Sequence, residues 1–296
     1  MLAEDTRILA ILLAVIGAVF LSVGAQFQND AVAKEQGAPV LRGGLNVRQL
    51  LALLRKPRWL AGTSFLLLAI FAQLSALALA PLIVVQPVGV IALIITSLLN
   101  AYIYKVRLDL KTLGAIGITT LGVAAFVFFA AGSAIETRMG DEKLLLVVGV
   151  LLVLLLLFGA LFKIFHGNVG PLQYIFGAGV LYGFVASLAK VVIVRLEQGD
   201  YNWLTLLALV SLVAAAFLGG WFVQNAYASG PPDLVIAGLT VVDPAVAIAI
   251  AIVILGEASE AGVVQILGFM GSGIVAAAGV IMLAKVHPQT SNPKVS

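Results

Sequence analysis

The chain has 296 residues, of which 62% are hydrophobic and only 10% are charged, and its mean hydropathy is +1.14. This composition excludes a water-soluble domain, because the surface of such a domain would be almost entirely apolar. The net charge of +3 is explained more simply by the basic loops of a membrane protein than by nucleic-acid binding. The absence of cysteine excludes disulfides, and His166 and His287 lie too far apart in sequence to predict a metal site.

Apolar runs of about 20 residues are needed to cross the hydrocarbon of a bilayer. The sequence therefore predicts an all-α integral membrane protein with about nine transmembrane helices. The N-terminal stretch is predicted to be a retained first span, because Glu4 and Asp5 outweigh Arg7 where a signal peptide would be basic. The predicted spans are 7–29, 59–80, 82–104, 112–132, 144–165, 171–194, 204–226, 233–256 and 262–284.

The longest predicted loop, residues 30–58, is basic and contains a short amphipathic pattern. Val47, Leu50, Leu51 and Leu54 fall on one helical face, with basic residues around them. This pattern predicts a helix lying on the inner leaflet, where it serves either as a surface anchor or as a docking site for an acidic ligand.

Nine spans put the two termini on opposite sides of the membrane, and most of the 17 basic residues then fall on one side. Loops rich in Lys and Arg stay in the cytoplasm. We therefore expect the N-terminus outside the cell, the C-terminus in the cytoplasm and the chain in the plasma membrane. The few basic residues predicted on the outer side are Arg7, Arg138, Lys143 and Arg195.

An offset of 151 residues aligns the chain with itself without a gap. It pairs Gln73 with Gln224 and Pro81 with Pro232, besides one Phe pair and two Gly pairs. The offset matches span two with span seven, so the two repeats have opposite orientations. The sequence thus predicts inverted-topology repeats over residues 1–132 and 133–296, the first with the basic loop and the second with a short polar C-terminal tail. Such repeats are typical of secondary transporters, whose substrate site lies near the midplane.

The third and eighth spans, which contain corresponding parts of the two repeats, are both interrupted by proline. In span three, Gln86 precedes Pro87, and in span eight Asp243 precedes Pro244. Because Pro244 has no N–H, the carbonyl of Thr240 loses its helical donor and is predicted to be free for water, a ligand or a neighbour. A bent helix that presents a carboxylate near mid-membrane is a candidate substrate and coupling site.

Parts of the chain resemble the drug/metabolite transporter superfamily, and its EamA-type members in particular. Spans two and three read WLAGTSFLLLAIFAQLSALALAPLIVVQPVGV, and span eight reads DPAVAIAIAIVILGE before a Gly-rich last helix. Pro244, Gly256 and Glu257 match the family's motif of a proline-containing helix that ends in Gly-Glu. The nine spans, the outside N-terminus and the long basic first loop are similar to the NIPA-type magnesium-transporter branch. The resemblance implies a transporter of the drug/metabolite type.

Four more polar side chains in or beside the spans are candidates. Gln73 and Gln224 are equivalent by the repeat, and they either face a central cavity or join helices in lipid. Lys190 lies near the outer end of span six, where it either contributes to the site or snorkels to the interface. Glu257 ends span eight and is predicted to be a solvated helix terminus. The substrate and coupling candidates are thus Asp243, Pro244, Thr240, Gln73, Gln224, Gln86 and Lys190.

These observations favour a secondary transporter that moves a small metabolite, an amphiphile or a lipid-linked head group by alternating access. A flippase for polyprenyl- or lipid-linked sugars is the first alternative, with basic loops available for a phosphate. Magnesium or another divalent cation ranks lower, because magnesium prefers carboxylates and Asp243 is the only one deep in a predicted span. A non-transporting structural subunit is the alternative outside transport.

The sequence predicts neither an enzyme nor a bound cofactor, since no set of nucleophile, base and orienting residue and no phosphate-binding glycine loop is found in it. The expected partners are a small-molecule or lipid-linked substrate and membrane lipids, without nucleic acid. The sequence leaves open a homodimer or a membrane-complex partner.

Overall fold

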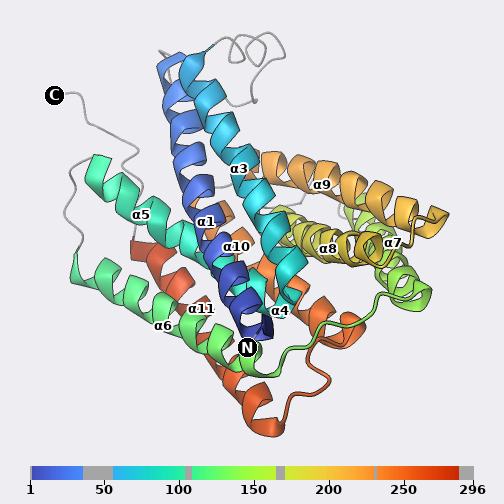
Figure 1. Cartoon of the computed structure of the whole chain (residues 1–296). Helices are drawn as coiled ribbons and strands as arrows, with labels where there is room; N and C mark the ends of the chain where they lie inside the picture. Colours follow the sequence, from blue (N-terminus) through green and yellow to red (C-terminus); the bar gives the residue numbers. More distant parts are fainter. Residues whose placement is uncertain (1, 36–55, 104–108, 165–170, 230–231, 287–296) are drawn as a thin grey trace, which may run out of the picture. The chain divides into compact units, whose positions relative to one another are not determined.

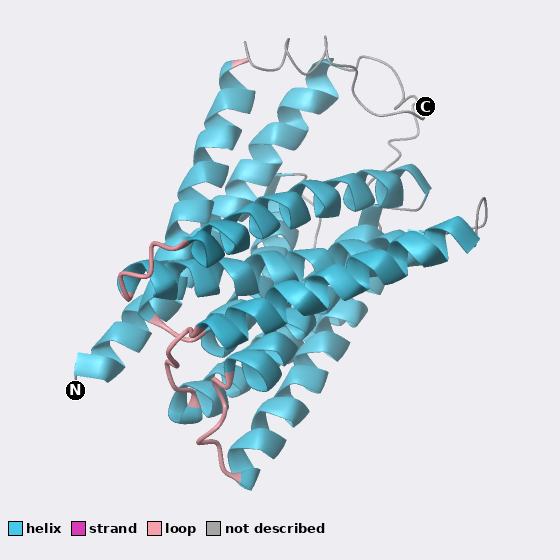
Figure 2. Ribbon diagram, turned by 90° about the vertical axis from the view of Figure 1, so that its right-hand side faces the viewer, coloured by secondary structure: helices cyan, strands magenta, loops and turns pink. Residues whose placement is uncertain are grey.

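The computed structural model describes residues 2–35, 56–103, 109–164, 171–229 and 232–286. These residues form helices joined by short loops, with no strand among them (Figure 2). The helices are labelled in Figure 1. Their bounds in chain order are α1 (Leu2–Glu35), α3 (Pro57–Leu79), α4 (Leu82–Val85), η1 (Gln86–Val90), α5 (Ile91–Ile103), α6 (Leu110–Ser133), α7 (Asp141–Ile164), α8 (Pro171–Glu197), α9 (Trp203–Ser229), α10 (Pro232–Ile250), η2 (Ala251–Leu255) and α11 (Val263–Val286).

Nine helical segments within the described ranges are long and apolar enough to cross a membrane. They correspond one for one to the predicted spans and confirm an all-helical, multi-pass membrane protein. The third span is composed of α4, η1 and α5, and the eighth of α10 and η2. Helix α1 continues to Glu35, so the first loop begins later than predicted. The amphipathic pattern at residues 47–54 and the polar tail from residue 287 onward lie outside the described residues.

The helices pack into two compact units. The first contains residues 1–80 and 88–106, and the second contains residues 81–87 and 107–296. The chain therefore leaves the second unit inside η1, between Pro87 and Val88. The predicted repeats meet at residue 132 instead. Because repeats are defined by symmetry and the units by packing, the inverted repeat stays a prediction.

In the first unit, α1 and α3 run side by side along most of their length (Figure 1). Gly24 allows this approach, since a Cβ there would lie 2.9 Å from the carbonyl oxygen of Gly62. Helix α5 packs on α1 as well, and the hydroxyl of Ser22 lies 2.8 Å from the carbonyl oxygen of Ala92. Small residues at helix contacts are what membrane helices use, because lipid provides no hydrophobic drive to bring them together.

In the second unit, α8 is the most buried of the membrane-length helices described. It packs against α9, α10 and α7. Gly179 and Gly183 face α10, where an added Cβ would lie 2.6 Å from Cβ of Val242 and 2.7 Å from Cβ of Val246. Helix α6 lies along α11 in the same unit (Figure 1). The glycines of α8 therefore set how closely α10, the helix of Asp243, approaches the centre of this unit.

Local chemistry explains several helix ends. Pro57 occupies the first turn of α3, where its missing N–H costs nothing. Asp109 caps α6 by accepting a hydrogen bond of 2.8 Å from the N–H of Thr112. At the end of η2, Gly256 takes a left-handed conformation with φ of 74°, which terminates the helix.

Candidate functional site

The interruption predicted in the third span is present. After Pro81 the chain forms the four-residue helix α4, and from Gln86 to Val90 it narrows to a 3₁₀ helix before α5 begins. Pro87 lies in this segment, where its ring and missing N–H disfavour a regular α-helix. Helix α4 packs against α6, α8, α10 and η2, all in the second unit.

Gln86 is the polar residue at this interruption. It is 7% exposed, and its Nε2 has no hydrogen-bond partner within the described part of the chain. A buried amide without a partner costs free energy comparable to a lost hydrogen bond. The Nε2 of Gln86 is thus one of two buried side-chain atoms without a hydrogen-bond partner among the residues described.

The second such atom belongs to Asp243. It is half-buried, and its Oδ1 is shielded from the surface with no hydrogen-bond partner in the described ranges. On α8, Gly179 lies against the backbone of Asp243, and Tyr182 interacts with its carboxylate electrostatically. An ionised carboxylate inside a membrane costs a few kcal/mol on insertion scales, about 2.5–3.5 for Asp. Asp243 is therefore placed where a proton or a cationic group would relieve that cost.

Pro244 and Thr240 lie on the same helix. The helix α10 continues through Pro244, and the departure from α geometry comes later, at the π-helical turn Ala251–Leu255. Thr240 is half-buried and interacts with another group, so the structure does not support a free group at this residue. The irregular part of the eighth span thus lies nearer its end than the sequence predicts. Single π turns inside helices occur frequently at functional sites.

Glu257 follows this π turn, and the prediction that it is a solvated terminus is wrong. It is 1% exposed. Its two carboxylate oxygens accept hydrogen bonds from the backbone N–H groups of Leu82, at 3.0 Å, and Ile83, at 2.8 Å. The first amides of a helix have no partner within the helix, and here Glu257 satisfies two of them in α4. Burial raises the pKa of Glu257 to about 7, although the two backbone hydrogen bonds and Lys190 favour its charged form.

A signal for this contact is present in the sequence. Pro81 starts span three, and Gly256 and Glu257 end span eight, and the predicted path places both points at the same end of the bundle. A carboxylate at this end can accept hydrogen bonds from the first backbone amides of a helix, which have no partner within the helix.

Lys190 is close to Glu257 in space. It is 1% exposed, and its Nζ donates to Oε1 of Glu136 at 2.7 Å. The charge of Lys190 also acts on Glu257. Lys190 therefore does not snorkel into solvent but lies buried with carboxylates near it.

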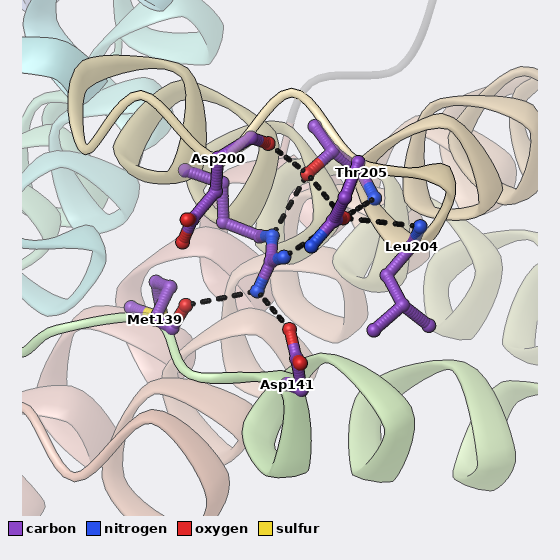
Figure 3. Close-up of polar contacts among 7 residues, drawn as sticks. Met139, Asp141, Asp200, Leu204 and Thr205 are labelled. Atoms are coloured by element: carbon purple, nitrogen blue, oxygen red, sulfur yellow. Dashed lines mark hydrogen bonds and ion pairs between the residues drawn. The ribbon is translucent and has the colours of Figure 1, made fainter.

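Arg195, one turn beyond Lys190 on α8, is also fully buried. Its guanidinium donates to Oγ1 of Thr205 at 2.8 Å, the carbonyl of Met139 at 3.1 Å and Oδ1 of Asn202 at 3.0 Å, and it pairs with Asp141 at 2.9 Å (Figure 3). These contacts tie the end of α8 to the starts of α7 and α9. Arg195 was predicted only as an outer-side basic residue, because hydropathy does not reveal such a partner set.

The other two polar candidates are Gln73 and Gln224. Gln73 is half-buried in α3 and belongs to the first unit. Gln224 lies in α9, and its side chain is outside what the structure describes. No group of three or more His, Asp or Glu side chains suited to a metal ion occurs in the described part of the chain. The structure thus pairs Lys190 with Glu136 and places its charge where it acts on Glu257, whereas the role of the two glutamines stays a prediction.

Within the described residues, nine apolar helices and the polar side chains buried along them define this chain as a multi-pass membrane protein. The chain is similar to an uncharacterized protein of Corynebacterium glutamicum, with 27% identity over 257 residues and a match that covers 86% of each chain. No family model and no solved structure matches the chain.

Proposed function

We propose that the chain is a secondary transporter of the drug/metabolite type, which moves a small metabolite, an amphiphile or a lipid-linked head group by alternating access. The observation that carries this proposal is the Oδ1 of Asp243, which is shielded and unpartnered among the described residues, on a membrane-length helix. Ionisable residues inside the membrane are rare and usually functional. A residue that only held helices together would be expected to have a partner.

The backbone supports the same proposal. The third and eighth spans both leave α geometry, at Gln86–Val90 and at Ala251–Leu255. Discontinuous transmembrane helices are a recurring feature of transporter sites, although the 151-residue offset does not pair these two irregular segments. Helix α4, which Gln86 directly follows, packs against α10, which bears Asp243. An unsatisfied donor therefore lies next to an element that contacts the helix of the unsatisfied acceptor.

In this proposal Asp243 alternates between a charged and a neutral state. When the site is empty, a proton neutralises it, and a cationic or hydrogen-donating group of the substrate takes the place of that proton. The two interrupted spans belong to inverted repeats, and the N-terminus faces the outside of the plasma membrane. The basic residues near 55–58 and 105–111 would favour a lipid-linked phosphate if the carrier were a flippase.

A structural membrane subunit is favoured by a different observation. The buried charge of Arg195 is satisfied by side chains and backbone from three segments. Such a network stabilises one arrangement of helices, which a scaffold requires as much as a carrier does. The two candidate functions differ in what they require of Asp243.

The test is the substitution Asp243→Asn, which keeps the shape of the side chain and removes its charge. The protein in proteoliposomes is challenged with amphiphilic cations, neutral metabolites and a polyprenyl-linked sugar while charge movement and internal pH are recorded. We expect wild-type protein to respond to one of these classes in a pH-dependent way. Asp243→Asn should insert normally and lose the response or its pH dependence.

The matched control is Glu260→Gln, which removes a carboxylate from an exposed position beyond the eighth span. It should leave the response unchanged. If Asp243→Asn transports with the wild-type pH profile, Asp243 is a packing residue. If wild-type protein responds to none of the three substrate classes, the structural subunit becomes the better reading.

A further inference from the structure

The Gly-Glu pair that ends the eighth span makes contacts that the proposed transport site does not use. Glu257 holds the first two amides of α4 although the two segments are separated by 175 residues at Leu82. No other side chain in the described ranges accepts a hydrogen bond from these two amides. The position of α4, and of Gln86 at its end, thus depends on one buried carboxylate.

The segment between α6 and α7 contacts the same end of the eighth span, at Leu255 and Glu257. The N–H of Ile135 donates to the carbonyl of Glu257 at 2.9 Å. The carbonyl of Leu255 accepts from Oγ1 of Thr137 at 2.7 Å and from Nζ of Lys143 at 2.6 Å. This segment, together with Lys143 of α7, therefore satisfies backbone groups that the π turn and the left-handed Gly256 leave without helical partners.

Lys190 connects this segment to the central helix α8. It pairs with Glu136, whose side chain is 47% exposed, while Lys190 itself is 1% exposed. The charged groups that act on Glu257 are Lys190 from α8, which attracts it, and Glu136 from the segment between α6 and α7, which repels it. Lys143 from α7 lies near Gly256. Residues Leu82–Val85 of α4 bring no charge, only their amides.

We propose that Glu257 is a positioning residue for the interrupted third span, and that Glu257, Lys190 and Glu136 together form a latch that keeps α4 closed against η2. When the latch is released, the amides of Leu82 and Ile83 lose their acceptor and α4 separates from η2, which admits water to the residues it covers. The inference rests on the proposed function for one point only, that this opening serves as the gate at the outer end of the carrier. The latch itself is a property of the second unit and is testable without a substrate.

The test uses the natural absence of cysteine in the chain. Val85 of α4 is 0% exposed, so Val85→Cys should react slowly with a water-soluble maleimide while the latch is closed. Adding Glu257→Ala removes both acceptors, and we expect the labelling rate in lipid nanodiscs to rise about tenfold or more at constant pH. Glu260→Ala, an exposed carboxylate three residues away, is the matched control and should leave the rate unchanged.

A second cysteine separates local opening from general loosening. Ala208 in α9 is also 0% exposed and lies in the same unit. Ala208→Cys should stay unreactive when Glu257 is replaced. The proposal is overturned if Glu257→Ala does not accelerate labelling of Val85→Cys beyond the Glu260→Ala control. It is equally overturned if Ala208→Cys accelerates by the same factor.

Lys190 supplies the other half of the test. Lys190→Met removes the cation that pairs with Glu136 and whose charge acts on Glu257, so it should also accelerate labelling of Val85→Cys. Lys190→Arg keeps the charge and should stay close to wild type. Equal rates for Lys190→Met and Lys190→Arg would remove Lys190 from the latch. Because no substrate enters these measurements, a chain that transports nothing but shows the expected labelling contradicts the proposed function and leaves the latch intact.

Discussion

Charged side chains in the second unit differ in how many hydrogen-bond and ion-pair partners they have. We use this difference to distinguish residues that stabilise the fold from candidate functional residues. Arg195 has partners for its guanidinium from the loop before α7, from α7 and from the start of α9. The Oδ1 of Asp243 has none in the part of the chain that is described. A satisfied buried charge rigidifies one packing, whereas an unsatisfied one costs free energy until a proton or ligand arrives. We therefore assign Arg195 to the scaffold and Asp243 to the proposed transport site.

At the scale of single residues, Glu257 also predicts how stability depends on pH. Burial raises its pKa from 4.5 to about 7 in the folded chain. The neutral form is thus favoured by folding, so this contribution to stability is fully present below about pH 4.5 and is lost as the pH rises through 7. We expect the Tm in detergent to be higher at pH 5 than at pH 8, with a slope of up to about 1.4 kcal/mol per pH unit between the two pKa values.

The check is the variant Glu257→Gln, which cannot titrate and should flatten this slope. Asp109→Asn is the control. The hydrogen bonds from Thr112 lower the pKa of Asp109 below its ordinary value of 3.8, so this carboxylate does not titrate between pH 5 and 8. An unchanged slope in Glu257→Gln would show that other groups govern the pH dependence.

At the scale of elements, the contact between α8 and α10 depends on glycine. A Cβ at Gly183 would lie 2.7 Å from Cβ of Val246 and 3.0 Å from the backbone nitrogen of Ala247. Neither atom is the end of a flexible side chain, so the helices have to shift. We expect Gly183→Ala to lower the free energy of unfolding by about 1–3 kcal/mol, measured by thermal or denaturant unfolding in detergent.

Gly149→Ala in α7 is the matched control, because a Cβ there meets nothing within 4 Å. This variant should be neutral or slightly stabilising, since alanine is the better helix former. If Gly183→Ala is as stable as Gly149→Ala, the close approach of α8 and α10 does not contribute to the stability of the unit.

At the scale of the whole molecule, the alternation of nine spans predicts which segments share a side of the membrane. The contacts Arg195 to Asp141 and Glu257 to Leu82 join segments that the predicted path places at one end. Reporter fusions at residue 45 and after Ser296 should both report the cytoplasm, because the basic loops are retained there. Activity of an exported reporter at either position would contradict the predicted orientation.

Much of the fold was predictable because the bilayer imposes it. Hydrocarbon thickness sets the length of each span and the absence of water requires helices, so hydropathy alone predicts the nine segments closely. The interruption at Gln86 and Pro87 was predictable as well, since proline acts on the backbone next to it. Asp243 could be identified as a candidate from the sequence because it is a carboxylate within an apolar run, and recognising this does not require knowledge of its neighbours in space.

The sequence by itself thus determined the spans, the broken third helix and the presence of an acid within the eighth span, because each follows from the residue and its near neighbours along the chain. Only the tertiary structure decided what happens to the charges at the ends of the helices. Hydropathy treats Glu257 and Lys190 as residues near an interface and therefore as solvated, yet both are 1% exposed. The amides that hold Glu257 come from a segment 175 residues away, and hydropathy along the chain does not pair the two segments.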